Sequence, residues 1–156
     1  MTYRITGLSP EPFVHLIGAS EDVLAQAGAT RVTASADKSW PGRVSLNDAK
    51  AGESLILLNH ISHDVATPYR SSHAIYVAES AEAAAAEYTD QIPPVFEGRP
   101  MAFRAFDAGG MLSNAALALP GQADATIREL FENDDIAYIH AHNAAHGCFS
   151  AKVERN

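Results

Sequence analysis

The sequence predicts an α+β fold: a single domain over residues 1–156, built on a mostly antiparallel sheet with a C-terminal β-hairpin and three to four short helices. Two observations lead to this fold class. Segments typical of strands occur at both ends and in the middle of the chain, with helical segments between them. The 156 residues are 47% hydrophobic and 19% charged, an ordinary globular composition that suffices for one hydrophobic core.

Turn and capping residues divide the chain into its elements. We expect strands at residues 3–5, 30–35, 55–59, 73–77, 101–106 and, slightly favoured over helix, 111–119; helices at 10–17, 20–28, 80–88 and from 124 onward; a polar loop at 61–72; and an irregular arm at 89–100. Ser20 is a suitable N-cap for the second helix, and Gly28 ends it. The uniformly apolar run at 55–59 predicts a strand buried on both faces at the sheet centre. The Ala-rich segment 80–88 favours helix.

The C-terminal hairpin is the clearest signal in the chain. Two segments alternate in polarity, 137–142 and 148–153, and the five residues between them include Gly147. One register puts every polar group on one face and every apolar group on the other. The expected polar pairs are His142 with Cys148, His140 with Ser150 and Tyr138 with Lys152; the expected apolar pairs are Ala141 with Phe149, Ile139 with Ala151 and Ala137 with Val153. This register sets the only thiol of the chain beside an imidazole, with β-carbons about 4.5–5.5 Å apart.

Composition argues against several classes of partner. The formal net charge is -8, from 11 basic and 19 acidic residues, and the basic residues are scattered, so we expect no nucleic-acid partner. The single cysteine excludes an intrachain disulfide and favours a reducing compartment. The first residues lack the apolar segment of a signal peptide, and the longest apolar run, 55–58, is too short to cross a bilayer. These features predict a cytoplasmic protein with no membrane partner.

The hairpin supplies the candidate catalytic residues. A thiol becomes a nucleophile as thiolate, and a neighbouring imidazole stabilises that form by accepting the proton. Cys148 and His142, with Asn143 next in line, have the residue types of a cysteine hydrolase, although hydrolases of that kind take their Cys and His from distant segments. The alternative is a polar hairpin face with a half-buried, unreactive thiol.

Histidines offer a second kind of site. His140 and His142 lie two residues apart on one strand and therefore point to the same side, as the ligands of a metal ion can. No spacing in the chain fixes a third ligand, and histidines half-buried among aromatic rings are the alternative. We expect no tightly bound structural metal.

A third candidate is the junction around residue 70. Arg70 is followed by Ser71 and, two residues later, by His73, a combination that suits a phosphate or a carboxylate. His73 shares its expected strand face with Ile75 and Val77, which points it inward. The alternative is a loop arginine paired with one of the nineteen acidic residues.

Several runs in combination resemble one family. They lie at residues 43–49, 52–53, 57–59, 67–77, 104–107, 137–143 and 147–149. The sequence resembles, over nearly its whole length, the bacterial family catalogued as domain of unknown function 1203. The resemblance implies no activity, cofactor or substrate. The runs include Arg70, His73, His142 and Cys148, so we expect one pocket in which the first two lie near the polar end of the hairpin.

The residues therefore support one leading hypothesis and three alternatives. The leading hypothesis is an uncharacterised small cytoplasmic protein with a pocket for a small anionic molecule. Arg70 would be the charge anchor, and the hydrogen-bonding groups would be Ser71, His73, Asn143 and His140. The alternatives are a hydrolase-like enzyme with Cys148 as nucleophile and His142 as base, a metal-dependent enzyme using His140 and His142, and a non-catalytic interaction domain whose arm at 89–100 docks a partner or a second copy. The sequence specifies no cofactor and is compatible with a homo-oligomer.

Overall fold

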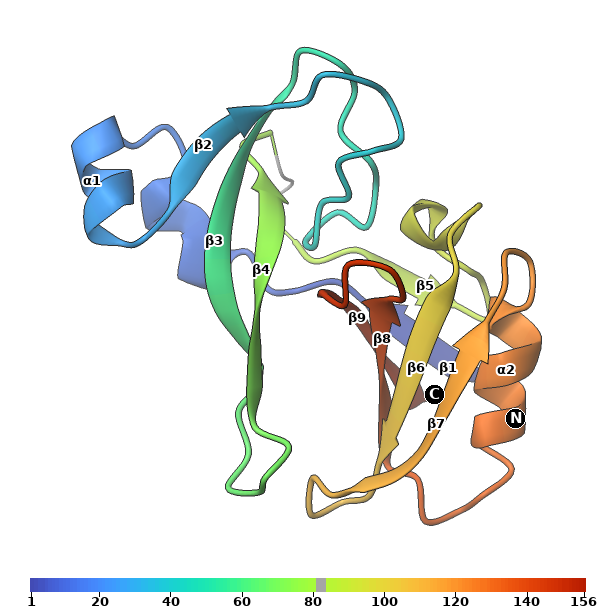
Figure 1. Cartoon of the computed structure of the whole chain (residues 1–156). Helices are drawn as coiled ribbons and strands as arrows, with labels where there is room; N and C mark the ends of the chain where they lie inside the picture. Colours follow the sequence, from blue (N-terminus) through green and yellow to red (C-terminus); the bar gives the residue numbers. More distant parts are fainter. Residues whose placement is uncertain (81–83) are drawn as a thin grey trace.

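The computed structural model describes residues 1–80 and 84–156, in which two antiparallel sheets form the framework (Figure 1). The larger sheet has the order β5-β1-β9-β8-β6-β7, and the smaller one the order β2-β3-β4. The strands are β1 (Tyr3–Thr6), β2 (Thr30–Thr33), β3 (Ser54–His63), β4 (Ser71–Ala78), β5 (Glu87–Thr89), β6 (Met101–Phe106), β7 (Leu112–Ala118), β8 (Tyr138–Asn143) and β9 (Phe149–Arg155). The helices are η1 (Glu11–Leu16), α1 (Glu21–Gln26), η2 (Pro94–Phe96) and α2 (Ala123–Leu130). The predicted α+β class, with its mostly antiparallel pairing and C-terminal hairpin, is confirmed.

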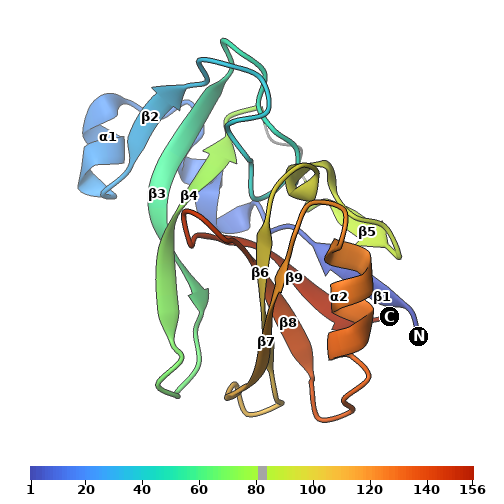
Figure 2. The same cartoon turned by 45° about the vertical axis from the view of Figure 1, so that its right-hand side comes forward.

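The main hydrophobic core lies between the larger sheet and α2 (Figure 2). Because side chains alternate along a strand, Ile139 and Ala141 of β8 enter this core while the residues between them face the other way. The helix contributes Ile127 and Leu130 from one stripe, and Phe131 at its end completes the contact. The other face of the sheet is thereby left for polar residues.

That other face meets the smaller sheet. β3 and β4 lie beside β8 in both views, and residues 41–44 run buried between the sheets (Figures 1 and 2). The backbone of Gly42 forms a bridge with Tyr76 of β4, and the N–H of Arg43 donates to the Tyr76 carbonyl at 2.9 Å. The smaller sheet also packs against η1 and α1, where Leu16 and Leu24 contact Ile56. The Ser20 hydroxyl caps α1, as predicted.

Two expected boundaries are wrong. The strand predicted at 55–59 continues to His63, so the loop after it is shorter, and Asn59 is exposed although β3 is the central strand of its sheet. Of the helix predicted at 80–88, residues 81–83 lie outside the described part, and Glu87–Thr89 forms β5 instead. Backbone pairing with β1, which places Tyr88 opposite Ile5, overrides the helical preference of the alanines there.

The hairpin forms, but its predicted register is wrong. His140 pairs with Lys152 and Tyr138 with Glu154, two residues further along β9 than expected. Near the turn the register shifts between Ala141 and His142, which leaves Ser150 as the extra residue of a β-bulge. As a result Phe149 lies opposite His142 with its ring against the histidines, on the side of the sheet away from the core that Ala141 enters.

In the chain at 1–80 and 84–156, none of the helices combines the length and the apolar character needed to cross a bilayer.

Candidate functional site

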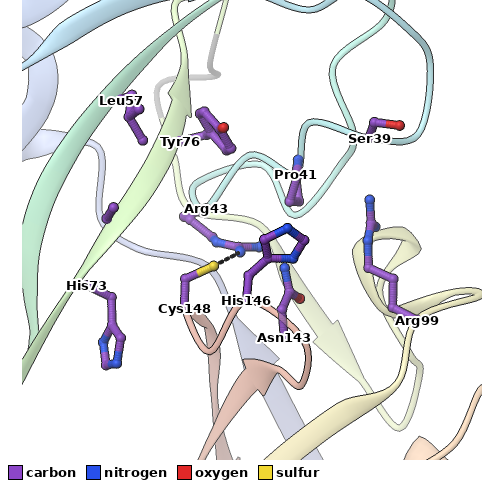
Figure 3. A pocket seen from close by; sticks show the side chains of 11 residues that line it. Ser39, Pro41, Arg43, Leu57, His73, Tyr76, Arg99, Asn143, His146 and Cys148 are labelled. Carbon is purple, nitrogen blue, oxygen red and sulfur yellow. Dashed lines mark hydrogen bonds between the residues drawn. The ribbon is translucent and has the colours of Figure 1, made fainter.

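A cavity of about 420 Å³ opens where β4, the segment 39–43 and the turn between β8 and β9 come together (Figure 3). Its polar lining includes Arg43, His73, Asn143, His146 and Cys148. The volume lies in the range of small-molecule sites, and polar groups from three separate segments converge on it. The cavity is therefore the candidate functional site.

Arg43 is the most unusual group in this wall. Its side chain is 1% exposed, yet within the described residues no carboxylate forms an ion pair with it. Nη1 donates to the Ser150 hydroxyl at 3.0 Å and Nη2 to the Cys148 sulfur at 3.8 Å, while the buried Nε has no partner in the described structure. Burial lowers the pKa of the guanidinium and the Cys148 sulfur opposes that shift, but an arginine keeps its charge at neutral pH. The wall thus carries a buried, uncompensated positive charge.

The bulge in β9 explains how this charge is held. It turns Ser150, which is fully buried, toward the guanidinium. The turn is closed by two backbone hydrogen bonds, from the N–H of Asn143 to the Cys148 carbonyl and from the N–H of Gly147 to the Asn143 carbonyl. Arg43 therefore contacts two residues that the hairpin brings together.

The predicted pairing of Cys148 with His142 is wrong, because His142 lies opposite Phe149. The half-buried sulfur contacts Arg43, whereas Nδ1 of His142 hydrogen-bonds the Gly147 carbonyl at 2.9 Å (Figure 3 shows the sulfur contact). Burial lowers the pKa of His142 to about 4, so its imidazole is neutral at neutral pH. The structure brings the two residues into one turn without a hydrogen bond between their side chains, and a catalytic role for them stays a prediction.

Asn143 contributes a second group without a partner. Its side chain is 8% exposed, and its Oδ1 makes no hydrogen bond to any described residue. Figure 3 shows the amide beside Cys148 on the cavity wall. A buried acceptor without a donor costs free energy, which a ligand with an O–H or N–H group recovers.

A row of four imidazoles lies beside this cavity, at the junction of the two sheets. The ring centroids are 4.9 Å apart for His63 and His140, 6.5 Å for His140 and His142, and 4.9 Å for His142 and His73. His63 and His73 have further partners, the Tyr138 hydroxyl at 2.7 Å and the Ser62 hydroxyl at 3.1 Å. Burial lowers the pKa of His140 to about 3. His73 therefore points inward, as predicted, and the row is a packed contact between the sheets in which the lowered pKa values of His140 and His142 keep these two imidazoles neutral at neutral pH.

The metal hypothesis gains no geometric support from this row. His140 and His142 do lie on one face of β8, as predicted. Among the residues that the structure describes, however, no group of three or more His, Cys, Asp or Glu side chains is arranged to hold a metal ion.

Arg70 and Ser71 do not line the cavity. Arg70 is exposed in the turn between β3 and β4, at the far end of these strands in Figure 1, and its Nε donates to Asp64 at 3.0 Å. Ser71 starts β4 opposite His63. It lies two residues before the cavity-lining His73, about 7 Å along the same strand. The loop arginine paired with an acidic residue, weighed above as the alternative, describes Arg70.

Comparison with family models matches residues 39–155 to the family described as "Protein of unknown function (DUF1203)". The chain belongs to this family. No curated protein and no solved structure matches the chain. Every lining residue of the cavity, from Ser39 to Cys148, lies within the DUF1203 segment.

Sequence reasoning missed Arg43 in this DUF1203 chain. The residue type alone does not distinguish a buried arginine from an exposed one. One signal was available: the residues on either side, Pro41, Gly42 and Val44, are apolar or small. An arginine without nearby acidic residues in such a segment is a candidate for burial.

Proposed function

We propose that the protein binds a small anionic molecule, a carboxylate or phosphate compound, in the cavity beside Arg43. The observation that carries the proposal is the buried guanidinium, which pairs with no carboxylate in the part of the chain that the structure describes. Burying an unpaired charge costs several kcal/mol, roughly, and an anion in contact with the charge recovers part of that cost. A ligand carboxylate or phosphate would accept from the free Nε of Arg43.

A second arginine in the wall has a different role. The Arg99 guanidinium donates to both carboxylate oxygens of Asp48, at 2.7 and 2.9 Å, and to the carbonyls of Lys38 and Val95. Its charge is compensated and its geometry fixed, so it shapes the wall. Arg43 is the anchor that remains.

The surroundings limit what the ligand is. Arg43 is almost wholly buried, so a ligand reaches only the edge of its guanidinium, and Asn143 and His146 supply the remaining polar contacts. A net charge of -8 repels extended polyanions, whereas a small anion is enclosed by the cavity. Because Cys148 is a free thiol, we assign this function to a reducing compartment, the cytoplasm.

The test compares two arginines by isothermal titration calorimetry. The probes are inorganic phosphate and malonate, titrated into the wild type, Arg43→Gln and Arg70→Ala, with circular dichroism to confirm folding. We expect Arg43→Gln to weaken binding about tenfold or more, because a hydrogen bond to a charged group contributes about 1.5–3 kcal/mol. Arg70→Ala should bind as the wild type does.

Three results would contradict the proposal: no binding of either anion to the wild type at millimolar concentration, unchanged binding by a folded Arg43→Gln, or a loss confined to Arg70→Ala. The last result would mean that the anion binds at Arg70, the residue that the sequence alone favours.

A further inference from the structure

We propose that Cys148 is a peroxide-reactive thiol, whose sulfur, held against the Arg43 guanidinium, attacks small hydroperoxides that enter the cavity. The inference concerns the same cavity as the proposed function and shares its guanidinium. It adds a reaction and a class of reactant. It does not require that an anion bind there.

The Arg43 guanidinium is in direct contact with the Cys148 sulfur. Nη2 of Arg43 lies 3.8 Å from Sγ of Cys148. The guanidinium contacts two side chains, Ser150 and Cys148, and of these the thiol is the one that forms an anion readily. The sulfur supports the charged form of the arginine against the effect of burial. The thiolate is the nucleophilic form of cysteine, and the guanidinium in contact with the sulfur supplies the positive charge with which a thiolate pairs.

The second argument is independent of the thiol and comes from the free polar atoms beside it. Nε of Arg43 is a buried donor and Oδ1 of Asn143 a buried acceptor, and neither has a partner among residues 1–80 and 84–156. Both residues line the cavity onto which the half-buried Cys148 opens (Figure 3). A hydroperoxide carries an O–H donor next to an acceptor oxygen, so one small molecule can satisfy both atoms.

The proposed reaction is a displacement at the O–O bond of the hydroperoxide. The thiolate attacks the terminal O–H oxygen of the hydroperoxide, an S–O bond forms, and the O–O bond breaks. The leaving alkoxide, or hydroxide from hydrogen peroxide, takes a proton from solvent and departs as an alcohol or water. The sulfur is oxidised by two electrons to a sulfenic acid while the peroxide is reduced.

Return to the thiol requires a partner molecule. Cys148 is the only cysteine of the chain, so no second thiol in the chain can form a disulfide with the sulfenic acid. An external thiol supplies the electrons: one molecule forms a mixed disulfide and releases water, and a second releases Cys148 as a thiol and leaves as a disulfide.

The experiment measures the rate at which hydrogen peroxide oxidises the reduced protein at pH 7, with dimedone trapping and mass spectrometry of the Cys148 peptide. The reference is the same chain unfolded in urea, in which the thiol is fully exposed and Arg43 is distant. An unactivated half-buried thiol reacts more slowly when folded. We expect Cys148 in the folded protein to react about tenfold faster or more, the size of a charge-assisted contact. An equal or slower rate in the folded protein overturns the inference.

Arginine variants test whether Arg43 causes the faster oxidation of Cys148 in the folded protein. Arg43→Lys should lose most of the folded-state acceleration, because the ammonium cannot reproduce the fork that contacts Ser150 and Cys148. Arg4→Lys is the matched control, since Arg4 lies on β1 outside the cavity lining. A folded Arg43→Lys that keeps the wild-type rate overturns the assignment. If this variant does not fold, the comparison of folded and unfolded wild type decides alone.

Adding phosphate or malonate separates this inference from the proposed function. A bound anion competes with the thiolate for the guanidinium and should slow oxidation. Fast oxidation with no anion binding supports the inference and contradicts the proposed function. Arg43-dependent anion binding with no acceleration of oxidation in the folded protein supports the proposed function and overturns the inference.

Discussion

Two regions of this protein contain the same residue types and use them differently. At the junction of the sheets, Arg43 contacts Ser150 and Cys148, beside the histidine row, and is buried without a carboxylate. In the turn between β3 and β4, Arg70 is exposed and paired with Asp64, with Ser71 next to it. The turn resembles an anion site in sequence, but solvent and an acidic side chain already satisfy it. A charge becomes available to a ligand when the fold buries it and leaves it unpaired.

The largest difference between the two regions should be seen in the pH dependence of stability. Burial lowers the pKa of His140 to about 3 and of His142 to about 4, against 6.5 for an ordinary histidine. Below 6.5 the unfolded chain therefore binds more protons than the folded one, so stability is lost as the pH falls. We expect the free energy of unfolding to drop by about 4 kcal/mol between pH 8 and pH 5.

Urea denaturation at several pH values measures this loss. The range above pH 5 isolates the histidines from Glu79, whose pKa is lowered to about 2 by Arg31 and whose contribution falls at more acidic pH. Arg104 and Lys152 face the row, and these two cations add to the effect of burial that lowers the pKa of His140. His140→Phe should remove about half of this loss, because His142 remains, and the same substitution at the exposed His15 should leave the loss unchanged. A flat wild-type profile would show that water reaches His140 and His142 and that burial does not lower their pKa values.

The second-largest difference should be between the effects of substituting Arg43 and Arg70 on the free energy of unfolding. Arg43→Ala removes a fully buried side chain and should lower the free energy of unfolding by about 2–4 kcal/mol through the void it leaves. Arg43→Met fills the space without a charge and should stay within about 1 kcal/mol of the wild type or exceed it. Arg70→Ala should change stability by less than about 0.5 kcal/mol.

Urea denaturation at pH 7 provides these three values. The contrast between Ala and Met at position 43 separates packing from charge. A loss of several kcal/mol in Arg43→Met would mean that the guanidinium stabilises the fold, and the case for a charge kept for a ligand would weaken.

The smallest expected difference concerns the two serines. Ser150→Ala leaves Nη1 of Arg43 without its acceptor and should cost about 1–2 kcal/mol, because a buried donor loses its partner. Ser71→Ala, at the start of β4, should cost less than about 0.5 kcal/mol. Thermal unfolding of the two variants side by side measures this difference. Equal effects would mean that the Ser150 contact adds nothing to the position of Arg43.

The sequence predicts the positions of the strands in this protein better than the register in which they pair. Alternating polarity located β8 and β9, yet the bulge at Ser150 moved the pairing by two residues. Residues 87–89 lie in a strand because β1 offers a free edge, a tertiary contact that an Ala-rich segment does not reveal.

The site was predictable only in part. His73, Asn143 and Cys148 were named from local pattern and do line the cavity, because strand periodicity sets the direction in which a side chain points. Arg43 and Arg70 are the same residue type, and they differ in burial and in pairing: Asp64 pairs with Arg70, whereas no carboxylate of the described residues pairs with the buried Arg43. The apolar and small residues around Arg43 were the one local signal of its burial.

The most direct test of the central claim observes the two guanidinium groups themselves. Nuclear magnetic resonance of ¹⁵N-labelled protein resolves arginine Nε–H signals, which Arg43→Lys and Arg70→Lys assign. Because Nε of Arg43 has no partner and Nε of Arg70 donates to Asp64, we predict that malonate shifts the Arg43 signal saturably and leaves the Arg70 signal in place. A saturable shift at Arg70 with none at Arg43 would contradict the account.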